Sequence, residues 1–127
     1  MFDWGNYLAL ADNLLNPKED GTHDEACLRS AVSRAYYAVF HRARDFAVSK
    51  NNILLDSIKS QRHSEHLSLQ EFFTGDSDLT YKQIGADLSR LHRKRVDCDY
   101  KNFQITEGNA RFHVAFAKSI LGKIPTI

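Results

Sequence analysis

The sequence LRSAVSRAYYAVFHRARDF, residues 28–46, decides the fold of this chain. At about 100° per residue on a helix, it separates into a wide apolar arc and a narrower polar arc. The apolar arc is rich in alanine, which lets a neighbouring helix approach closely, and only Arg42 interrupts it. Its members are Leu28, Ala31, Val32, Ala35, Tyr36, Ala38, Val39, Phe40, Ala43, Phe46 and Ala47. We therefore predict a central helix with its wide face in the core.

The polar arc of the same helix differs from an ordinary solvated surface. Such surfaces favour Lys, Glu and Gln, whereas this arc offers hydroxyl, imidazole and guanidinium groups. Two interpretations stay open: a partly exposed face on which Tyr and Arg stems cover apolar neighbours, or a functional surface. The members of the polar arc are Ser30, Ser33, Arg34, Tyr37, His41, Arg44 and Asp45.

The flanking segments predict further helices and no convincing strand. We expect helices over residues 2–16, 64–73, 78–99 and from Thr106 to about 121, with a loop over 53–61. Thr22 and Glu25 form a capping-box signature that would begin the central helix. The side chains expected to point inward in the last three helices include Leu67, Phe72, Phe73, Tyr81, Ile84, Leu88, Leu91, Cys98, Ala110, Val114, Phe116, Ala117, Ile120 and Leu121. The prediction is an all-α, antiparallel four- to five-helix bundle in one domain, residues 1–127.

Composition narrows the class of protein. The chain has 127 residues, a size typical of one domain, and a net charge of +1, so any attraction to nucleic acid must be local. Cys27 and Cys98 have neither zinc-ligand spacing nor the density of a disulfide scaffold. No apolar run approaches the ~20 residues of a membrane span, and the N-terminus lacks a signal-peptide pattern. We expect a cytoplasmic protein with no membrane association.

Arg95 breaks the apolar pattern of the helix predicted at 78–99. The apolar positions recur at steps of three and four, and Arg95 occupies the step between Leu91 and Cys98. A charge at a core-facing position is costly unless it is paired. Asp99, four residues on, could pair with it and fix packing, or Arg95 could hold a ligand.

A zinc site is a weak alternative. His63 and His66 are three residues apart and His92 lies on another predicted helix, but no Cys or Glu stands at ligand spacing. The chain also lacks a Gly-rich phosphate loop and a GxSxG motif. We predict no metal and no cofactor.

Three blocks of the sequence resemble the HEPN domains. They are SRAYYAVFHRAR at 33–44, the pair His63-Ser64 opening the next helix, and RVDCDY at 95–100. The small stand-alone prokaryotic branch carries Ser-Arg-x-Tyr-Tyr-Ala-x-Phe-His and later Arg-x-x-x-Asp-Tyr. The resemblance covers nearly the whole chain, with the blocks in the expected order.

The resemblance implies a four- to five-helix bundle that is commonly homodimeric and is often encoded beside a small nucleotidyltransferase. Many HEPN proteins are metal-independent RNA endonucleases of toxin–antitoxin, CRISPR and anti-phage systems. Their signature is an arginine followed, after four to six residues, by a histidine. The chemistry needs a cation that stabilises a phosphorane and a group that moves the proton of the ribose 2′-hydroxyl.

This sequence departs from that signature. The histidine window after Arg95 is Tyr100 to Asn102, and Tyr100 occupies its first position. A tyrosine, with a pKa near 10, is a poor base at neutral pH. Arg34 and His41 satisfy the spacing, but on the central helix.

Three hypotheses follow from these residues. The first in rank is a non-catalytic HEPN-type module that binds RNA, a nucleotide or a partner protein, with Ser33, Arg34, Tyr37 and Asp99 as ligand-binding residues. A role in toxin–antitoxin or anti-phage defence would give it a nucleotidyltransferase antitoxin as partner. The second is an active endoribonuclease that uses Arg95 with His41 or His63, beside Tyr100. The third is a structural dimerisation unit.

Overall fold

The computed structural model describes residues 2–50, 65–102 and 104–126, and all regular structure in these ranges is helical. The helices are α1 (Asn6–Leu14), α2 (Glu25–Lys50), α4 (Glu65–Thr74), α5 (Leu79–Tyr100) and α6 (Glu107–Lys123). Within the described ranges there are five helices and no strand, as the sequence predicts. The loop predicted at 53–61 lies outside the described residues.

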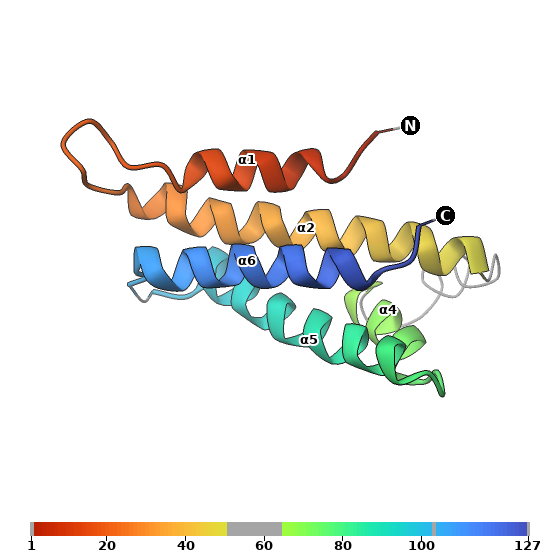
Figure 1. The fold of residues 1–127 in the computed structure, drawn as a ribbon. Coiled ribbons are helices and arrows are strands. Elements are labelled where there is room, and N and C mark those ends of the chain that lie inside the picture. The colour runs from red at the N-terminus through yellow and green to blue at the C-terminus, as the bar shows by residue number, and fades with distance from the viewer. Residues whose placement is uncertain (1, 51–64, 103, 127) are drawn as a thin grey trace.

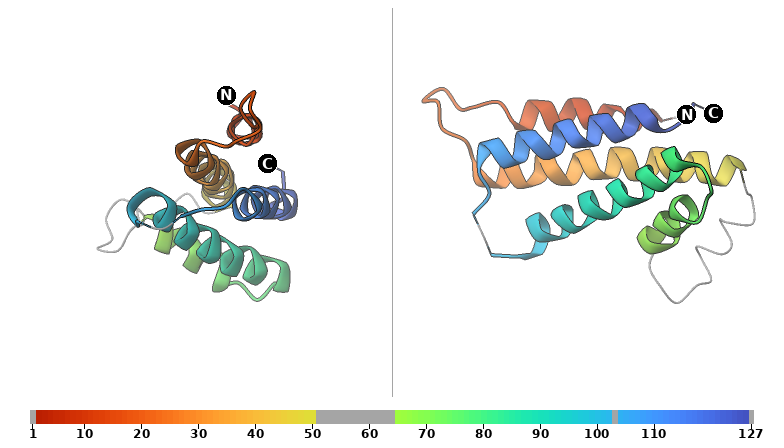
Figure 2. Two further views of the ribbon diagram at one scale, coloured as in Figure 1. Left: turned by 90° about the vertical axis from the view of Figure 1, so that its left-hand side faces the viewer. Right: turned by 60° about the horizontal axis from the view of Figure 1, so that its bottom comes forward.

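Helix α2 is the centre of the bundle, and α1, α5 and α6 lie alongside it (Figure 1). The chain reverses between α1 and α2 and again between α5 and α6. Helices α1 and α5 therefore run opposite to α2, and α6 runs in the same direction as α2 (Figure 1). Two further views show α1 and α5 on opposite sides of α2, with α6 beside all three (Figure 2). The short helix α4 packs on α5 and on α2 at one end of the bundle (Figure 2).

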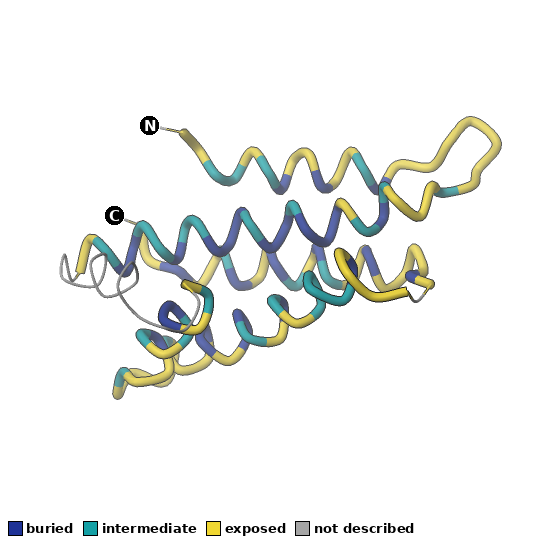
Figure 3. The backbone as a smooth tube through the Cα atoms, turned by 180° about the vertical axis from the view of Figure 1, so that it is seen from behind, coloured by how far each residue is buried: buried dark blue, intermediate teal, exposed yellow. Residues whose placement is uncertain are grey.

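The apolar arc predicted for residues 28–46 is confirmed as the core face of α2. Every member of the arc is buried, and the buried residues follow one side of the helix (Figure 3). Tyr36, Phe46 and Phe73 are among the largest side chains that are fully enclosed. Ser33, which the helical pattern assigns to the polar arc, is buried too. The burial of apolar surface around α2 is the main stabilising contribution to the bundle.

Helix α1 is shorter than the predicted range of 2–16. At its start the Asp3 carboxylate accepts a hydrogen bond from the backbone N–H of Gly5 (2.9 Å), which holds this segment in a turn. At its end, Leu15 and Asn16 donate to carbonyls three residues back, so the last turn is tightened before Pro17. The hydrogen bond to Asp3 and the position of Pro17 therefore make α1 shorter at both ends than predicted.

The capping-box prediction for the start of α2 is wrong. The hydroxyl of Thr22 donates to the Asp20 carboxylate (2.6 Å), so it is used within the preceding turn, where Gly21 has a positive φ of 82°. The Asp24 carboxylate instead accepts from the backbone N–H of Ala26 (2.8 Å). Two later helices do begin with a side-chain cap: Asp78 caps α5 and Thr106 caps α6.

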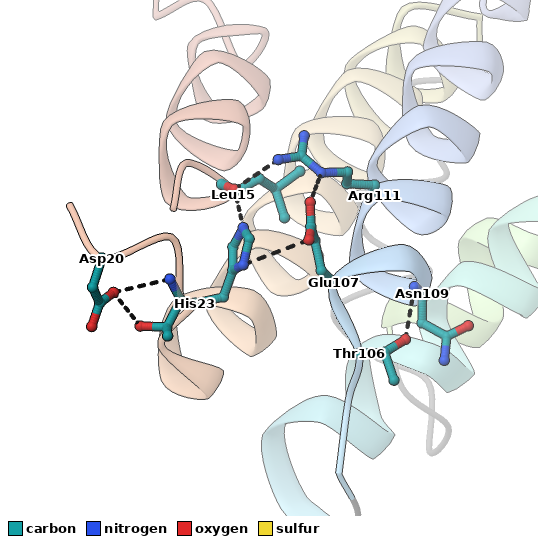
Figure 4. Close-up of polar contacts among 8 residues, drawn as sticks. Leu15, Asp20, His23, Thr106, Glu107, Asn109 and Arg111 are labelled. Atoms are coloured by element: carbon teal, nitrogen blue, oxygen red, sulfur yellow. Dashed lines mark hydrogen bonds and ion pairs between the residues drawn. The ribbon is translucent and has the colours of Figure 1, made fainter. Parts of the chain in front are cut away.

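A polar cluster joins the end of α1 to the beginning of α6 (Figure 4). The carbonyl of Leu15 accepts hydrogen bonds from His23 Nε2 (3.1 Å) and from a terminal nitrogen of Arg111 (3.0 Å). Glu107 accepts from Arg111 Nε (2.6 Å) and lies 3.6 Å from His23 Nδ1. This cluster satisfies a carbonyl that the α1 terminus leaves free, and it fixes α1 relative to α6.

Helices α4 and α5 approach closely at Gly85, which is buried on α5. The inward orientation predicted for Leu67 is wrong, because this side chain is 41% exposed while Ser68 and Leu69 turn towards the core. Phe73 is buried as predicted, and Phe72 is partly buried. On α5 the apolar seam is confirmed at Ile84, Leu88, Leu91 and Cys98.

None of the described helices has the length and apolar character that crossing a membrane requires.

Candidate functional site

The C-terminal end of α5 is fixed against the beginning of α2 by one arginine. Arg29 donates from one terminal nitrogen to the carbonyls of Cys98 (2.8 Å) and Lys101 (2.9 Å). Glu25 pairs with Arg29 (3.3 Å) and also accepts from the backbone N–H of Ile105 (3.0 Å). The RVDCDY segment, residues 95–100, is therefore held beside the polar arc of α2.

Arg95 is the charged centre of this contact between α2 and α5. Its side chain is only 13% exposed, as its position in the apolar seam predicts. One terminal nitrogen donates to the hydroxyl of Tyr37, and the guanidinium lies over the Tyr37 ring, 5.0 Å from its centre. The polar arc of α2 and the 95–100 segment thus face each other across a direct hydrogen bond.

Asp99 supplies the negative charge next to Arg95. Its Oδ2 lies 3.0 Å from Arg95 Nε, which makes an ion pair, and 3.4 Å from the hydroxyl of Ser33. No acceptor among the described residues has hydrogen-bond geometry towards the buried Arg95 Nε, so the Asp99 contact is electrostatic rather than directed. The structural alternative for Arg95, pairing along its own helix, is therefore present, but it leaves part of the guanidinium's donor capacity unused.

The remaining predicted residues surround this centre on two sides. Tyr100 is 75% exposed, and its ring centre lies 5.9 Å from the Arg95 guanidinium. His41 is one helical turn from Tyr37, with ring centres 6.0 Å apart, and it is stacked on Trp4 at 3.8 Å. Arg34 lies over the ring of Tyr7 at 5.7 Å.

A second cluster, of one tyrosine and two histidines, lies beside the Arg95 centre. The Tyr36 hydroxyl is 2.5 Å from His66 Nδ1, and His66 is stacked on His92 with ring centres 4.4 Å apart. Burial raises the pKa of Tyr36 above its ordinary value, so the hydroxyl stays protonated. We therefore assign Tyr36 as the donor and neutral His66 as the acceptor, with the imidazole proton of His66 on Nε2.

The histidines around the centre are held neutral. The pKa of His66 is lowered to about 4, first by burial and then by the adjacent His92 and the positive charge of Arg95. Burial also lowers the pKa of His92, with Arg95 as the second cause. The pKa of His41 is lowered by burial and then by Arg44, against the opposing carboxylates. At neutral pH these three imidazoles are therefore uncharged rather than cationic.

Acidification is expected to destabilise the fold through His66. The unfolded chain takes up a proton at this imidazole near pH 6.5, whereas the folded chain does so only near pH 4. Between these values the unfolded state binds more protons, so the free energy of unfolding falls as the pH falls. Because the ring is partly solvated, we expect a loss of about 1–2 kcal/mol.

The measurement is the thermal midpoint between about pH 7 and about pH 5, where most carboxylates stay ionised. His66→Phe should flatten the dependence. A midpoint that is the same across this range in the wild type would contradict the assignment.

The structure brings Ser33, Tyr37, Arg95, Asp99 and Tyr100, all of which were candidates from the sequence, close to one another. His63, proposed as a catalytic group, lies outside the described residues. Sequence reasoning missed Trp4 as the neighbour of His41, and it treated His66 and His92 only as weak zinc candidates. The only sequence signal for the contact between Trp4 and His41 was indirect. Trp4 and Tyr7 lie on one face of the helix predicted at 2–16, and the polar arc offers His and Arg side chains that pack well on aromatic rings.

The part of the chain that the structure describes holds no group of three or more His, Cys, Asp or Glu side chains placed to bind a metal ion. No family model, curated protein or solved structure matches this chain. The relationship to HEPN domains stays a prediction from the three sequence blocks.

Proposed function

We propose that this chain is a HEPN-type module that binds RNA or a nucleotide at the Arg95 centre. The observation that supports it best is Arg95 itself: a guanidinium placed in an apolar seam and held between two helices by Tyr37 and Asp99. A planar, pre-oriented guanidinium is suited to phosphate, because its fork matches two oxygens at once. The Tyr37 contact restricts the guanidinium before any ligand arrives.

The surroundings of Arg95 also fit a nucleic-acid ligand. Tyr100 presents an exposed ring within 5.9 Å of the guanidinium, so a base could stack on the ring while Arg95 contacts the adjoining phosphate. With a net charge of +1, the whole molecule has little attraction for a polyanion, so the attraction would come from Arg95 and its immediate surroundings.

A binding titration of the wild type tests this proposal. We expect saturable binding of a fluorescein-labelled single-stranded RNA of about 12 nucleotides, followed by anisotropy, with affinity that falls as salt rises. Competition by AMP distinguishes a mononucleotide site from a site that needs a strand. Absence of saturable binding at low salt, with both RNA and AMP, would reject the proposal.

Metal-independent RNA cleavage is the second candidate function, and the neutral state of His41 favours it. In this reaction the 2′-hydroxyl attacks phosphorus, the bond to the 5′-oxygen breaks, and a 2′,3′-cyclic phosphate and a 5′-hydroxyl form. Neutral His41 would accept the 2′-hydroxyl proton, water would give a proton to the departing 5′-oxygen, and Arg95 would stabilise the charge on the phosphorane. The Tyr37 ring is in contact with both of these groups.

Incubation of RNA with the protein in the presence of EDTA separates the two candidates. If the protein cleaves, His41→Ala should slow cleavage about 100-fold or more while RNA affinity stays near that of the wild type. Intact RNA under saturating protein leaves binding as the function.

We also propose that two copies form a homodimer and that a nucleotidyltransferase antitoxin is a partner in a defence system. Exposed apolar side chains such as Leu79 and Phe112 support the proposal that this chain packs against another protein chain. Light scattering should give a mass of twice 14.5 kDa at micromolar concentration, and a mass of 14.5 kDa would contradict the homodimer.

A further inference from the structure

An unbroken series of ring contacts leads from the Arg95 centre to the N-terminus. The Tyr37 ring faces His41 at 6.0 Å, and His41 is stacked on Trp4 at 3.8 Å with only 14° between the planes. Phe2 meets the edge of Trp4 at 4.8 Å. We call Phe2, Trp4, His41, Tyr37 and Tyr100 the aromatic strip.

The aromatic strip is exposed at its two ends and partly buried between them. Phe2 is 52% exposed on α1's side of the bundle, and Tyr100 is 75% exposed at the end of α5. Trp4, Tyr37 and His41 are partly buried. The rings at the two ends therefore have surface open to solvent, whereas the rings in the middle pack against one another.

Positive charge accompanies the strip. Arg95 lies between Tyr37 and Tyr100, and Arg34 lies over Tyr7, whose ring centre is 5.7 Å from that of Trp4. Carboxylates oppose these charges: Asp99 is paired with Arg95, and Asp3 is bonded to the backbone of Gly5. Asp45 and Glu65 also act on His41, where Arg44 adds a further positive charge. His41 adds no charge at neutral pH, because burial lowers its pKa.

We propose that the aromatic strip is a track for single-stranded nucleic acid, with bases stacked at Phe2 and Tyr100 and phosphates near Arg34 and Arg95. This proposal rests on the proposed function and extends it from a single centre to a path across α1, α2 and α5. Proteins that bind single strands combine aromatic platforms with cationic side chains in this way. A duplex is a poor occupant, because its bases are already stacked on one another and offer no free faces.

The test compares Phe2→Ala and Phe112→Ala, since both remove an exposed ring but Phe112 lies on α6, outside the strip. Phe2→Ala should weaken binding of a single-stranded RNA of about 12 nucleotides about 5- to 100-fold, the range for one base stack. Phe112→Ala should leave the affinity unchanged. Phe2 is exposed and precedes α1, so its removal should not disturb the fold.

Trp4 is the sole tryptophan and gives an independent readout. Unlabelled single-stranded RNA should change its emission with the dissociation constant found by anisotropy. A hairpin of the same composition should bind more weakly, and a DNA strand of the same sequence shows whether the 2′-hydroxyl contributes.

The proposed function and the track can fail separately. If RNA binding depends on Arg95 but Phe2→Ala and Trp4 emission show no effect, the strip is only packing and the Arg95 site stands. If the hairpin binds as tightly as the strand, the track is overturned. If no nucleic acid binds at all, both proposals fall.

Discussion

Gly85→Ala is expected to destabilise the fold by about 2–3 kcal/mol, near the upper end of the range for overpacking a core. A Cβ at this position would lie 2.5 Å from Thr74 Cγ2, 2.9 Å from Thr74 N and 3.0 Å from the carbonyl oxygen of Gln70. Two of these three atoms belong to the backbone of α4, so a side-chain rotation cannot relieve the clash. Helix α4 would have to move away from α5.

Gly122→Ala is the matched control for this prediction. Gly122 also lies in a helix, α6, but a Cβ there meets nothing within 4 Å. Alanine should therefore change the free energy of unfolding by no more than about 0.5–1 kcal/mol, in the stabilising direction. Urea denaturation of the two variants measures both effects, and equal midpoints for Gly85→Ala and the wild type would contradict the close packing of α4 on α5.

Movement of α4 would also disturb the histidine cluster. His66 lies on α4 and accepts the hydrogen bond from Tyr36 on α2. Gly85→Ala should therefore weaken the pH dependence of stability in addition to lowering stability at neutral pH. This links the glycine in the α4–α5 contact to the neighbourhood of Arg95.

Arg95→Ala is expected to weaken RNA or nucleotide binding about 10- to 100-fold, which corresponds to the loss of a hydrogen bond to a charged group. The effect on stability should be smaller, about 1 kcal/mol. The Asp99 side chain left behind is 27% exposed and stays near the hydroxyl of Ser33, so its charge is not stranded in the core. Tyr37 loses its guanidinium partner but is itself only partly buried.

Two further variants sharpen the Arg95 prediction. Arg95→Lys keeps the charge but loses the planar fork, so binding should fall while stability stays close to that of the wild type. Arg93→Ala removes the same charge from an exposed position on the same helix, and it should have little effect on affinity. Equal losses for Arg93→Ala and Arg95→Ala would show that only overall charge matters. Unchanged binding in Arg95→Ala would end the functional interpretation of this residue.

Much of the fold could be predicted because the information is local. The 3.6-residue periodicity of residues 28–46 defines the core face of α2, and Asp78 and Thr106 each cap a helix through a nearby backbone N–H. The failures are local too. Thr22 and Glu25 match the spacing of a capping box, but the Thr22 hydroxyl donates to Asp20 instead. A spacing rule does not show that two nearby groups compete for the same hydroxyl.

The candidate site could be predicted only in part. Arg95 stood out because it breaks an apolar seam, which is a property of one helix. Its contact with Tyr37, the Tyr36–His66 bond and the Trp4–His41 stack each join different helices, so they depend on how the helices cross and not on any one period.

The most direct test of the central claim is the arginine Nε–H signal of Arg95 in a ¹⁵N-resolved NMR titration with single-stranded RNA. Arg95→Lys identifies the signal by its loss, and the Arg93 signal serves as the internal reference. We predict that the Arg95 signal shifts and saturates with the dissociation constant found by anisotropy. Among the described residues, the polar atoms of this guanidinium contact Tyr37 and Asp99, so a bound phosphate would change its environment. An Arg95 signal that stays in place while RNA is fully bound would contradict the account.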